Sequence, residues 1–253
     1  MSRLHALMRN ADDGDIHAAF ENAARGHAIA PMEEHTQLSP AQMEERSLIC
    51  NGPGPRVDVN AFRELRTRLL AVGDGRSFVT LVVPVSRGSG GSYVCRNLAA
   101  AFAFDETKSA VLIDCNPYHP SQHQTMHIEP YRGGLVDYLG DSAAESSDVV
   151  YETGIPRLRL IPAGNVNGSG GEYFSSPRMQ LLLDTLRNRY PARYLFLDGP
   201  AVRGAPDARI LADLVDLVVL VAGHGRDSAA SIAQAAANFD PNKFAGVVLN
   251  QAP

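Results

Sequence analysis

The sequence predicts an α/β fold, a doubly wound and mostly parallel sheet flanked by helices. Short apolar runs rich in Val, Leu and Ile alternate with amphipathic segments, and the runs lack the polar alternation of a sheet with one wet face. The amphipathic segments have the length of the crossovers that parallel strands require. A glycine-rich turn after the first run and an aspartate at the end of two later runs support the same fold, because ligands bind at the carboxyl ends of such strands.

The elements are expected in a regular order along the chain. A charged helix at 60–70 comes first. Buried strands are expected at 78–85, 110–115, 158–162, 194–198, 217–222 and 244–250. The crossover helices are expected at 94–104, 177–188, 207–214 and 228–239. Since no internal repeat interrupts this order, it indicates one α/β domain.

Residues 1–56 differ in composition from the rest of the chain. They hold four of the six Met, several acidic residues and a Gly/Pro run at 51–55. We therefore expect a partly disordered N-terminal arm over 1–56 and one folded domain over 57–253. The alternative for the arm is a short amphipathic helix, since Ile16, Phe20 and Ala23 recur at helical spacing.

Charge and cysteine content limit the function classes. The 23 Lys and Arg against 28 Asp and Glu give a net charge of −5, which offers no bulk attraction to nucleic acid or anionic lipid. Cys50, Cys95 and Cys115 have no metal-ligand or redox spacing, as expected of reduced thiols. No segment has the roughly 20 apolar residues that span a bilayer. We expect a cytoplasmic protein, recruited to the inner face of the cell membrane only by a partner.

The turn at 86–92 carries the clearest chemical signal. Its sequence, Ser-Arg-Gly-Ser-Gly-Gly-Ser, joins a buried strand to a helix and so exposes backbone N–H groups that suit a phosphate. The spacing matches the P-loop pattern, but Gly91 stands at the lysine position and Val85 at the leading glycine position. Ser92 keeps the hydroxyl that would hold Mg²⁺. Phosphate binding is therefore expected to persist while transition-state stabilisation is weakened.

Two strands end in an aspartate. Asp114 closes the strand at 110–115 and Asp198 the strand at 194–198, which is the Walker-B arrangement for Mg²⁺. The alternative is that both carboxylates cap the turns that follow them. Together with the glycine-rich turn on the same sheet edge, they favour a site of nucleotide-binding ancestry of the P-loop NTPase type.

In their order, these motifs resemble the bacterial tyrosine autokinase (BY-kinase) family, whose members work with polysaccharide chain-length determinant proteins and are related to the MinD/ParA ATPases. The segment 61–67 resembles the family's Glu-x-x-Arg-x-x-Arg helix, with Arg63 and Arg66 matching and Asn60 replacing the Glu. Further matching segments lie at 96–99, 111–114, 160–164, 176–178, 207–209 and 246–250. The resemblance therefore covers 57–252, nearly all of the predicted domain.

The resemblance implies roles for particular residues. Asp114 and Asp198 would be the catalytic carboxylates, vestigial if activity is lost, and would hold Mg²⁺ with Ser92. Arg63 and Arg66 would mediate homo-oligomerisation. A membrane-embedded chain-length determinant or co-polymerase would be the partner, with no nucleic acid. The residues implied to contact ATP or ADP are Arg87, Gly88, Ser89, Gly90, Gly91, Ser92, Tyr93 and Asn250.

The departures from the family pattern agree with one another. Gly91 replaces the P-loop lysine, Asn116 replaces the second Asp of the second Walker motif, and Tyr118 replaces its basic residue. The tyrosine-rich tail that family members phosphorylate does not follow Asn250. A lysine, a carboxylate and an acceptor are separate parts of phosphoryl transfer, so these losses favour a pseudokinase with weakened or lost ATP and Mg²⁺ binding.

Three functional hypotheses follow. The favoured one is a catalytically degenerate kinase-like subunit in the assembly or regulation of exopolysaccharide biosynthesis or export. The alternative is an active Mg-ATP-dependent tyrosine kinase or MinD-like ATPase in which Arg87 substitutes for the lysine. A nucleic-acid-associated factor is disfavoured by the net charge. A metal site at His119, His123 and His127 is also disfavoured, because Pro120 interrupts a helix there.

Overall fold

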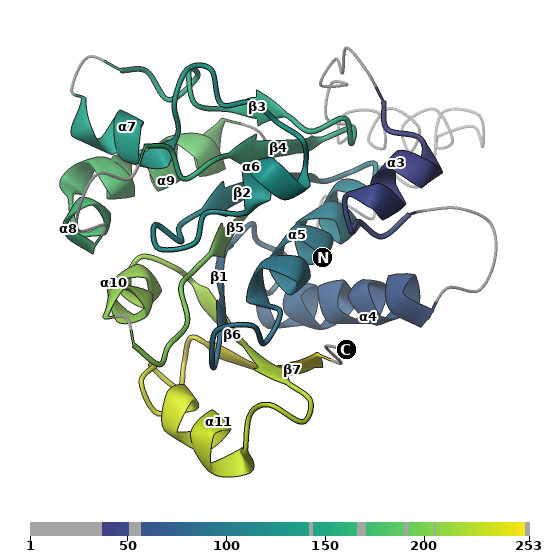
Figure 1. Cartoon of the computed structure of the whole chain (residues 1–253), viewed down its shortest axis with the longest axis vertical. Coiled ribbons are helices and arrows are strands. Elements are labelled where there is room, and N and C mark those ends of the chain that lie inside the picture. Colours follow the sequence, from purple (N-terminus) through teal and green to yellow (C-terminus); the bar gives the residue numbers. More distant parts are fainter. Residues whose placement is uncertain are drawn as a thin grey trace, which may run out of the picture.

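A seven-stranded sheet with strand order β3-β4-β2-β5-β1-β6-β7 forms the centre of the molecule (Figure 1). The computed structural model describes residues 37–50, 57–141, 144–165, 171–189, 192–204 and 206–250. The parallel strands are β1 (Val79–Pro84), β2 (Ser109–Asp114), β4 (Leu158–Ile161), β5 (Arg193–Asp198), β6 (Leu217–Gly223) and β7 (Phe244–Asn250). The mostly parallel α/β fold predicted from the sequence is confirmed.

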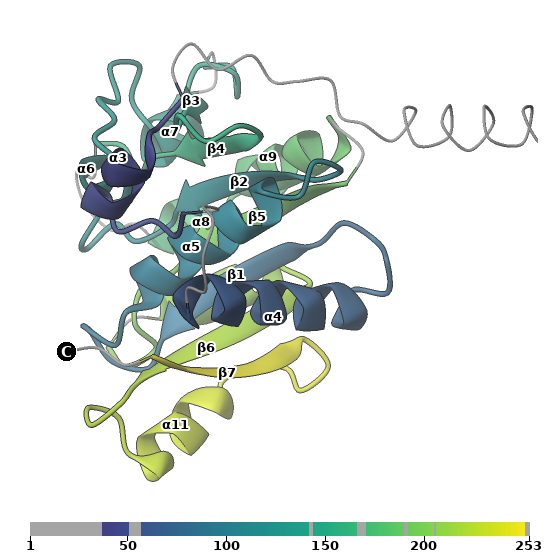
Figure 2. The same cartoon turned by 90° about the vertical axis from the view of Figure 1, so that its right-hand side faces the viewer.

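Helices cover both faces of the sheet (Figure 2). On one face lie α4 (Val57–Val72) and α5 (Gly91–Ala103), which pack together and share a core with the short α3 (Pro40–Glu45). On the other face lie α9 (Pro177–Asn188), α10 (Asp207–Asp213) and α11 (Ala229–Ala236). Three shorter helices are α6 (Gln122–Thr125), α7 (Leu135–Gly140) and α8 (Gly171–Phe174).

The alternation of side chains along β1 explains the two cores. Leu81 and Val83 point into the core beneath α9 and α10, whereas Val82 points into the core beneath α5. All three side chains are fully buried. A strand buried on both faces needs apolar residues at successive positions, which is the pattern that predicted it.

The sequence reading missed several elements. β3 (Tyr151–Glu152) is an antiparallel edge strand against β4, and with two residues it has no periodicity to detect. The helices α3, α6, α7 and α8 have four to six residues each and were not predicted either. α5 begins at Gly91 rather than at residue 94, because the helix starts immediately after the left-handed Gly90.

Residues 37–50, within the predicted arm, pack against the domain. Ser39 caps α3 with a capping box, and Leu48 and Ile49 are buried. The buried Asn97 side chain of α5 accepts a hydrogen bond from Ile49 N (2.7 Å) and donates one to Ser47 O (3.0 Å). These contacts attach the segment to α5. The helix considered around Ile16 and Phe20 lies outside the described residues.

Two further findings concern the expected environment of the protein. Among the residues that the structure describes, no helix is long and apolar enough to cross a membrane. Cys50, Cys95 and Cys115 are buried free thiols.

Candidate functional site

The glycine-rich turn (86–92) links the end of β1 to the start of α5. Gly88 (φ +85°) and Gly90 (φ +89°) both adopt the left-handed conformation, which glycine enters without a steric cost. Gly90 also lies against the amide group of Asn250, which donates a hydrogen bond to Ser89 O (3.2 Å). Asn250, predicted to contact nucleotide, therefore lies beside the turn and supports its backbone.

Asp227, in the loop between β6 and α11, fixes the conformation of the turn. Its carboxylate accepts hydrogen bonds from Ser86 Oγ (2.5 Å), Ser89 Oγ (2.6 Å) and Gly223 N (2.8 Å). Partial burial raises the pKa of Asp227, but these hydrogen bonds outweigh it and hold the pKa below its usual range. Sequence reasoning missed this residue, because Asp227 is more than a hundred positions away from the turn along the chain.

Gly91, at the position of the missing lysine, has no room for a side chain. A Cβ atom built there would lie 2.6 Å from Cδ and 2.9 Å from Cγ of Pro84, the last residue of β1. The backbone of Gly91 does not have a positive φ, so the obstacle is this ring and not the backbone conformation. The ring of Pro84 therefore occupies the space that a lysine side chain at position 91 would need.

A cavity of about 360 Å³ opens above the turn. Arg87, Ser92 and Tyr93 line it from the turn and α5, Asn116 and Tyr118 from the loop after β2, and Arg203 from the loop after β5. None of the lining residues in the described part of the chain is acidic. Backbone N–H groups at a helix start, flanked by two arginines, suit a phosphate group.

Arg226 adds a further cation near the turn. Its guanidinium lies against Gly88, where a Cβ would meet Cζ at 3.2 Å, and donates to the carbonyl oxygen of Arg87 (3.3 Å). Sequence reasoning identified only Arg87 as a substitute cation. Arg203 and Arg226 come from distant loops that the fold brings to the same place.

Asp114 and Asp198 form a buried carboxylate pair at the ends of β2 and β5, where they are register neighbours. Both oxygens of Asp114 are occupied: Oδ1 accepts from Asn116 N (3.1 Å), and Oδ2 accepts from Ser121 N and Gln122 N (3.1 Å each). Oδ2 of Asp198 accepts from Gln122 Nε2 (2.6 Å). Oδ1 of Asp198 is buried and has no hydrogen-bond partner.

Gln122 and Arg96, which sequence reasoning did not assign to the site, complete the cluster. The side chain of Gln122 is fully buried and donates to Ser92 O (3.0 Å) as well as to Asp198. Its carbonyl oxygen accepts from Arg96 Nη1 (2.9 Å). Arg96, on α5, points away from the cavity above the turn and into this buried cluster, so it is not a cation for bound phosphate.

Burial dominates the acidity of the carboxylate pair. It raises the pKa of both groups, and the charge of Asp198 raises that of Asp114 further. Backbone N–H groups oppose the rise at Asp114. Hydrogen bonds from Gln122 and Ser92, together with the charge of Arg96, oppose it at Asp198.

These contacts decide which groups the site fits. The turn and its arginines fit a phosphate group. For a divalent cation, Asp114 has no oxygen free of a hydrogen bond, which leaves the Ser92 hydroxyl and Oδ1 of Asp198 from the predicted set. Mg²⁺ takes oxygen ligands in a strict octahedral geometry, and this pair of side chains supplies few of them.

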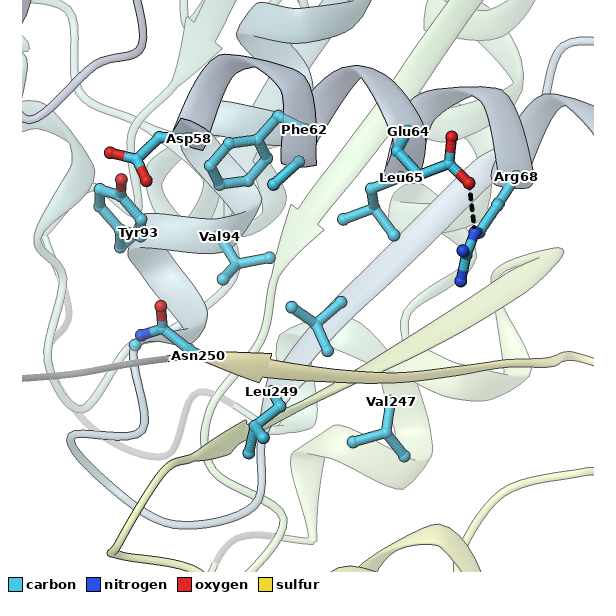
Figure 3. Close-up of a pocket in the computed structure, with 13 residues that line it drawn as sticks. Asp58, Phe62, Glu64, Leu65, Arg68, Tyr93, Val94, Val247, Leu249 and Asn250 are labelled. Atoms are coloured by element: carbon cyan, nitrogen blue, oxygen red, sulfur yellow. Dashed lines mark hydrogen bonds and ion pairs between the residues drawn. The ribbon is translucent and has the colours of Figure 1, made fainter. Parts of the chain in front are cut away.

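A larger cavity, of about 850 Å³, forms a groove between α4 and β7 next to the turn (Figure 3). Phe62 and Leu65 line it from α4, and Val247 and Leu249 from β7. Tyr93 lines both this groove and the smaller cavity. Apolar and aromatic walls beside a phosphate site are suited to the less polar part of a phosphorylated ligand.

The remaining predicted residues lie apart from the cavity. Arg63 is exposed on α4, and Arg66 donates to Ala101 O (2.8 Å) of α5, so Arg66 is partly engaged within its own chain. The three histidines do not share one helix, because α6 spans only Gln122–Thr125. Within the described ranges, no group of three or more His, Cys, Asp or Glu is placed to hold a metal ion.

Comparison with known proteins supports the resemblance seen in the motifs. No family model matches the chain. Over 210 residues it is 28% identical to the tyrosine-protein kinase Wzc of Salmonella typhi, covering 82% of this chain and 28% of Wzc. It is 26% identical to the tyrosine-protein kinase CpsD of Streptococcus agalactiae, covering 75% of this chain and 82% of CpsD. The resemblance to bacterial tyrosine kinases is therefore confirmed, although the chain spans little more than a quarter of Wzc.

Solved structures support the fold. The kinase domain of the Escherichia coli tyrosine kinase ETK superposes with a TM-score of 0.71 at 22% identity, covering 85% of this chain and 87% of that domain. The Aquifex aeolicus MinC:MinD complex superposes with a TM-score of 0.55 at 17% identity, covering 69% of this chain and 68% of the matched chain. The fold is thus that of the P-loop NTPases.

Proposed function

We propose that the chain is a kinase-like P-loop subunit that has lost phosphoryl transfer and acts in the assembly or regulation of exopolysaccharide biosynthesis or export. The observation that carries the proposal is Gly91, in a glycine-rich turn that is otherwise well formed. A P-loop lysine stabilises the charge that develops on the transferring phosphoryl group. Here Pro84 occupies the space that such a side chain would need.

The contacts of the carboxylate pair support the same proposal. Hydrogen bonds to a carboxylate compete with Mg²⁺ and with protons for its lone pairs. Asp114 is committed to three backbone N–H groups and Asp198 to Gln122, so both act within the fold. We propose that ATP or ADP is bound weakly at the glycine-rich turn. When bound, ATP would supply phosphates to the turn and its arginines.

The proposed partner is the cytoplasmic part of a membrane-embedded chain-length determinant protein. The matched region is 28% of Wzc, so most of that relative lies outside the part that resembles this chain. One solved neighbour is the chimerical protein CapA2B2, which covers 86% of this chain. Homo-oligomerisation through α4 is part of the proposal, with the exposed Arg63 as the contact residue. The protein would then be cytoplasmic and held at the membrane by its partner.

A specific observation favours one alternative, an active tyrosine kinase or MinD-like ATPase. Arg87 and Arg203 both line the cavity above the turn and could provide the cation that Gly91 cannot. In that case Arg87→Ala should abolish the remaining turnover. Arg76→Ala is the matched control, because Arg76 is equally exposed but lies at the opposite end of β1.

Equilibrium binding of ATP and ADP, with and without Mg²⁺, tests the proposal. Weak binding that changes little with Mg²⁺ is expected for the wild type and for Asp198→Ala, because Asp198 already has a protein partner. Tight binding that requires Mg²⁺ and is lost in Asp198→Ala would show that the carboxylate pair still serves a metal. Absence of binding at millimolar nucleotide would reduce the turn to a structural remnant and leave only the proposed role in assembly.

A further inference from the structure

Arg96 is a buried cation in α5, whose other buried residues carry no charge. Only 4% of its surface is exposed, and its neighbours Cys95 and Leu98 on α5 are fully buried. Burying a guanidinium is costly unless an opposite charge and hydrogen bonds compensate it. A compensating carboxylate must therefore lie nearby, and the strongest electrostatic partner of Arg96 is Asp198.

The Gln122 carboxamide connects these two charges. Because a guanidinium only donates, the carbonyl oxygen of Gln122 must face Arg96. The amide nitrogen then faces two acceptors, Ser92 O and Oδ2 of Asp198, and both of its hydrogens are used. The orientation of the side chain is thus fixed by its partners, and its dipole runs from the guanidinium to the carboxylate.

The same contacts compete with a divalent cation for Asp198. The amide nitrogen of Gln122 lies 2.6 Å from Oδ2 of Asp198, which leaves Oδ1 as the oxygen of this carboxylate without a hydrogen bond. The Arg96 charge in the same buried cluster repels a second cation, and such repulsion is strong where the local dielectric constant is low. The two unpartnered buried atoms of the cluster are Arg96 Nε and Asp198 Oδ1, which carry opposite charge.

We infer that Arg96, acting through Gln122, is the permanent counter-charge of the Asp114 and Asp198 pair, and that it replaces a divalent cation at these carboxylates. The inference deepens the proposed function and rests on it in treating the site as one that no longer needs a metal. It explains how two neighbouring carboxylates remain fully buried. It also gives Gln122 and Arg96 a positioning role at the end of β5.

Binding of Mn²⁺ to the nucleotide-free protein tests the inference. Electron paramagnetic resonance counts free Mn²⁺, and thermal unfolding in millimolar Mn²⁺ or in chelator measures stabilisation. The wild type is expected to bind no Mn²⁺ at the pair and to unfold at the same temperature in both solutions. Arg96→Met is expected to bind about one equivalent and to gain about 3–6 °C in Mn²⁺, since the metal supplies the missing charge.

Two further variants identify the site. Arg157→Met is the matched control, because Arg157 is a half-buried arginine that donates to Ala103 O of α5 (3.1 Å) but does not contact the pair. It is expected to show no response to Mn²⁺. The double variant Arg96→Met with Asp198→Asn removes one charge of each sign, leaves Asp114, and should lose the Mn²⁺ response of Arg96→Met.

The possible results distinguish a failure of this inference from a failure of the proposed function. Saturable Mn²⁺ binding by the wild type that is lost in Asp198→Asn would overturn the inference, and so would an Arg96→Met protein that folds but ignores Mn²⁺. If Arg96→Met does not fold, the double variant is expected to fold because the remaining carboxylate, Asp114, is held by three backbone N–H groups, and its failure to fold would contradict the inference. Since no nucleotide is present, failure of the proposed function would instead appear as Mg²⁺-dependent ATP turnover.

Discussion

Substitution of Gly91 by Ala isolates the contact between the glycine-rich turn and the ring of Pro84. In a helix, Gly→Ala ordinarily stabilises a protein by about 0.5–1 kcal/mol. Here the added Cβ would lie 2.6 Å from Cδ of Pro84. Forcing an extra carbon into a packed site costs about 1–3 kcal/mol. The overlap therefore outweighs the gain, and Gly91→Ala should be destabilising by about 1–2 kcal/mol.

The ring of Pro84 cannot move away easily. Its carbonyl oxygen accepts a hydrogen bond from Val202 N (3.0 Å), and Pro84 pairs with Val221 in the sheet. Pro84→Ala removes Cγ and Cδ, the two nearest atoms, and leaves Cβ at 3.1 Å, a tight contact that a small shift of position 84 relieves. The two substitutions should therefore be coupled, and Gly91→Ala should cost much less in the Pro84→Ala background.

Thermal or urea unfolding of the four proteins of this double-mutant cycle measures the coupling. Gly91→Ala alone is expected to lower the unfolding midpoint by about 3–6 °C. In the same way, Gly91→Lys alone should not strengthen ATP binding, whereas Pro84→Ala with Gly91→Lys should. A Gly91→Ala protein as stable as the wild type, or a cycle without coupling, would refute the steric argument.

Other predictions concern Asp227 beside the glycine-rich turn, Asn97 on α5 and two arginines of α4. Asp227→Ala should be destabilising by about 2 kcal/mol and should accelerate hydrogen exchange in the glycine-rich turn, which loses its charged acceptor. Folding lowers the pKa of Asp227, so its carboxylate contributes fully to the free energy of unfolding above the pKa of the unfolded chain. This contribution is lost as the pH falls through the pKa of the folded protein, and unfolding measured as a function of pH should show the loss. Asn97→Ala should detach residues 47–49 from α5, with a loss of about 2–3 kcal/mol and faster proteolysis there. Arg63→Glu should lower the sedimentation mass, whereas Arg66→Ala should reduce stability.

Controls and contrary results are available for each of these predictions. Asp240→Ala matches Asp227→Ala in charge but lies in the turn before β7, and it should leave exchange in the glycine-rich turn unchanged. Equal stability–pH curves for Asp227→Asn and the wild type would contradict the role of that carboxylate. Proteolysis at unchanged rates in Asn97→Ala would show that Leu48 and Ile49 hold the segment unaided. A mass unaffected by Arg63→Glu would remove α4 from the proposed assembly.

β1, β2, β5 and β6 were predictable because they are buried on both faces and therefore nearly continuously apolar. β7 was predicted from a similar apolar run, but it is an edge strand and its side chains are partly exposed rather than buried. β1, β2 and β5 also place the glycine-rich turn and the two aspartates on one edge, as the parallel arrangement requires. The spacing of the P-loop pattern alone was enough to recognise that Gly91 stands at the lysine position. The two-residue strand β3 and the short helices carry too few residues for any periodicity.

The contacts that define the site were not predictable from local patterns. Gln122 is a polar residue in a four-residue helix, and only the fold shows that its side chain lies between Arg96 and Asp198. Arg96 sits at a position that an apolar helix would fill with an aliphatic residue. A buried Arg in such a helix is a signal that could have been used, because it requires a buried partner. Asp227 gave no such signal.

Release of γ-phosphate from saturating Mg-ATP is the most direct test of the central claim, that this site binds phosphate without transferring it. The wild type is expected to release phosphate no faster than Asp198→Ala or buffer alone, because the lysine is absent and the carboxylate pair has internal partners. Mg²⁺-dependent release by the wild type that disappears in Asp198→Ala would contradict the account, since it would require a working cation and a metal at the pair.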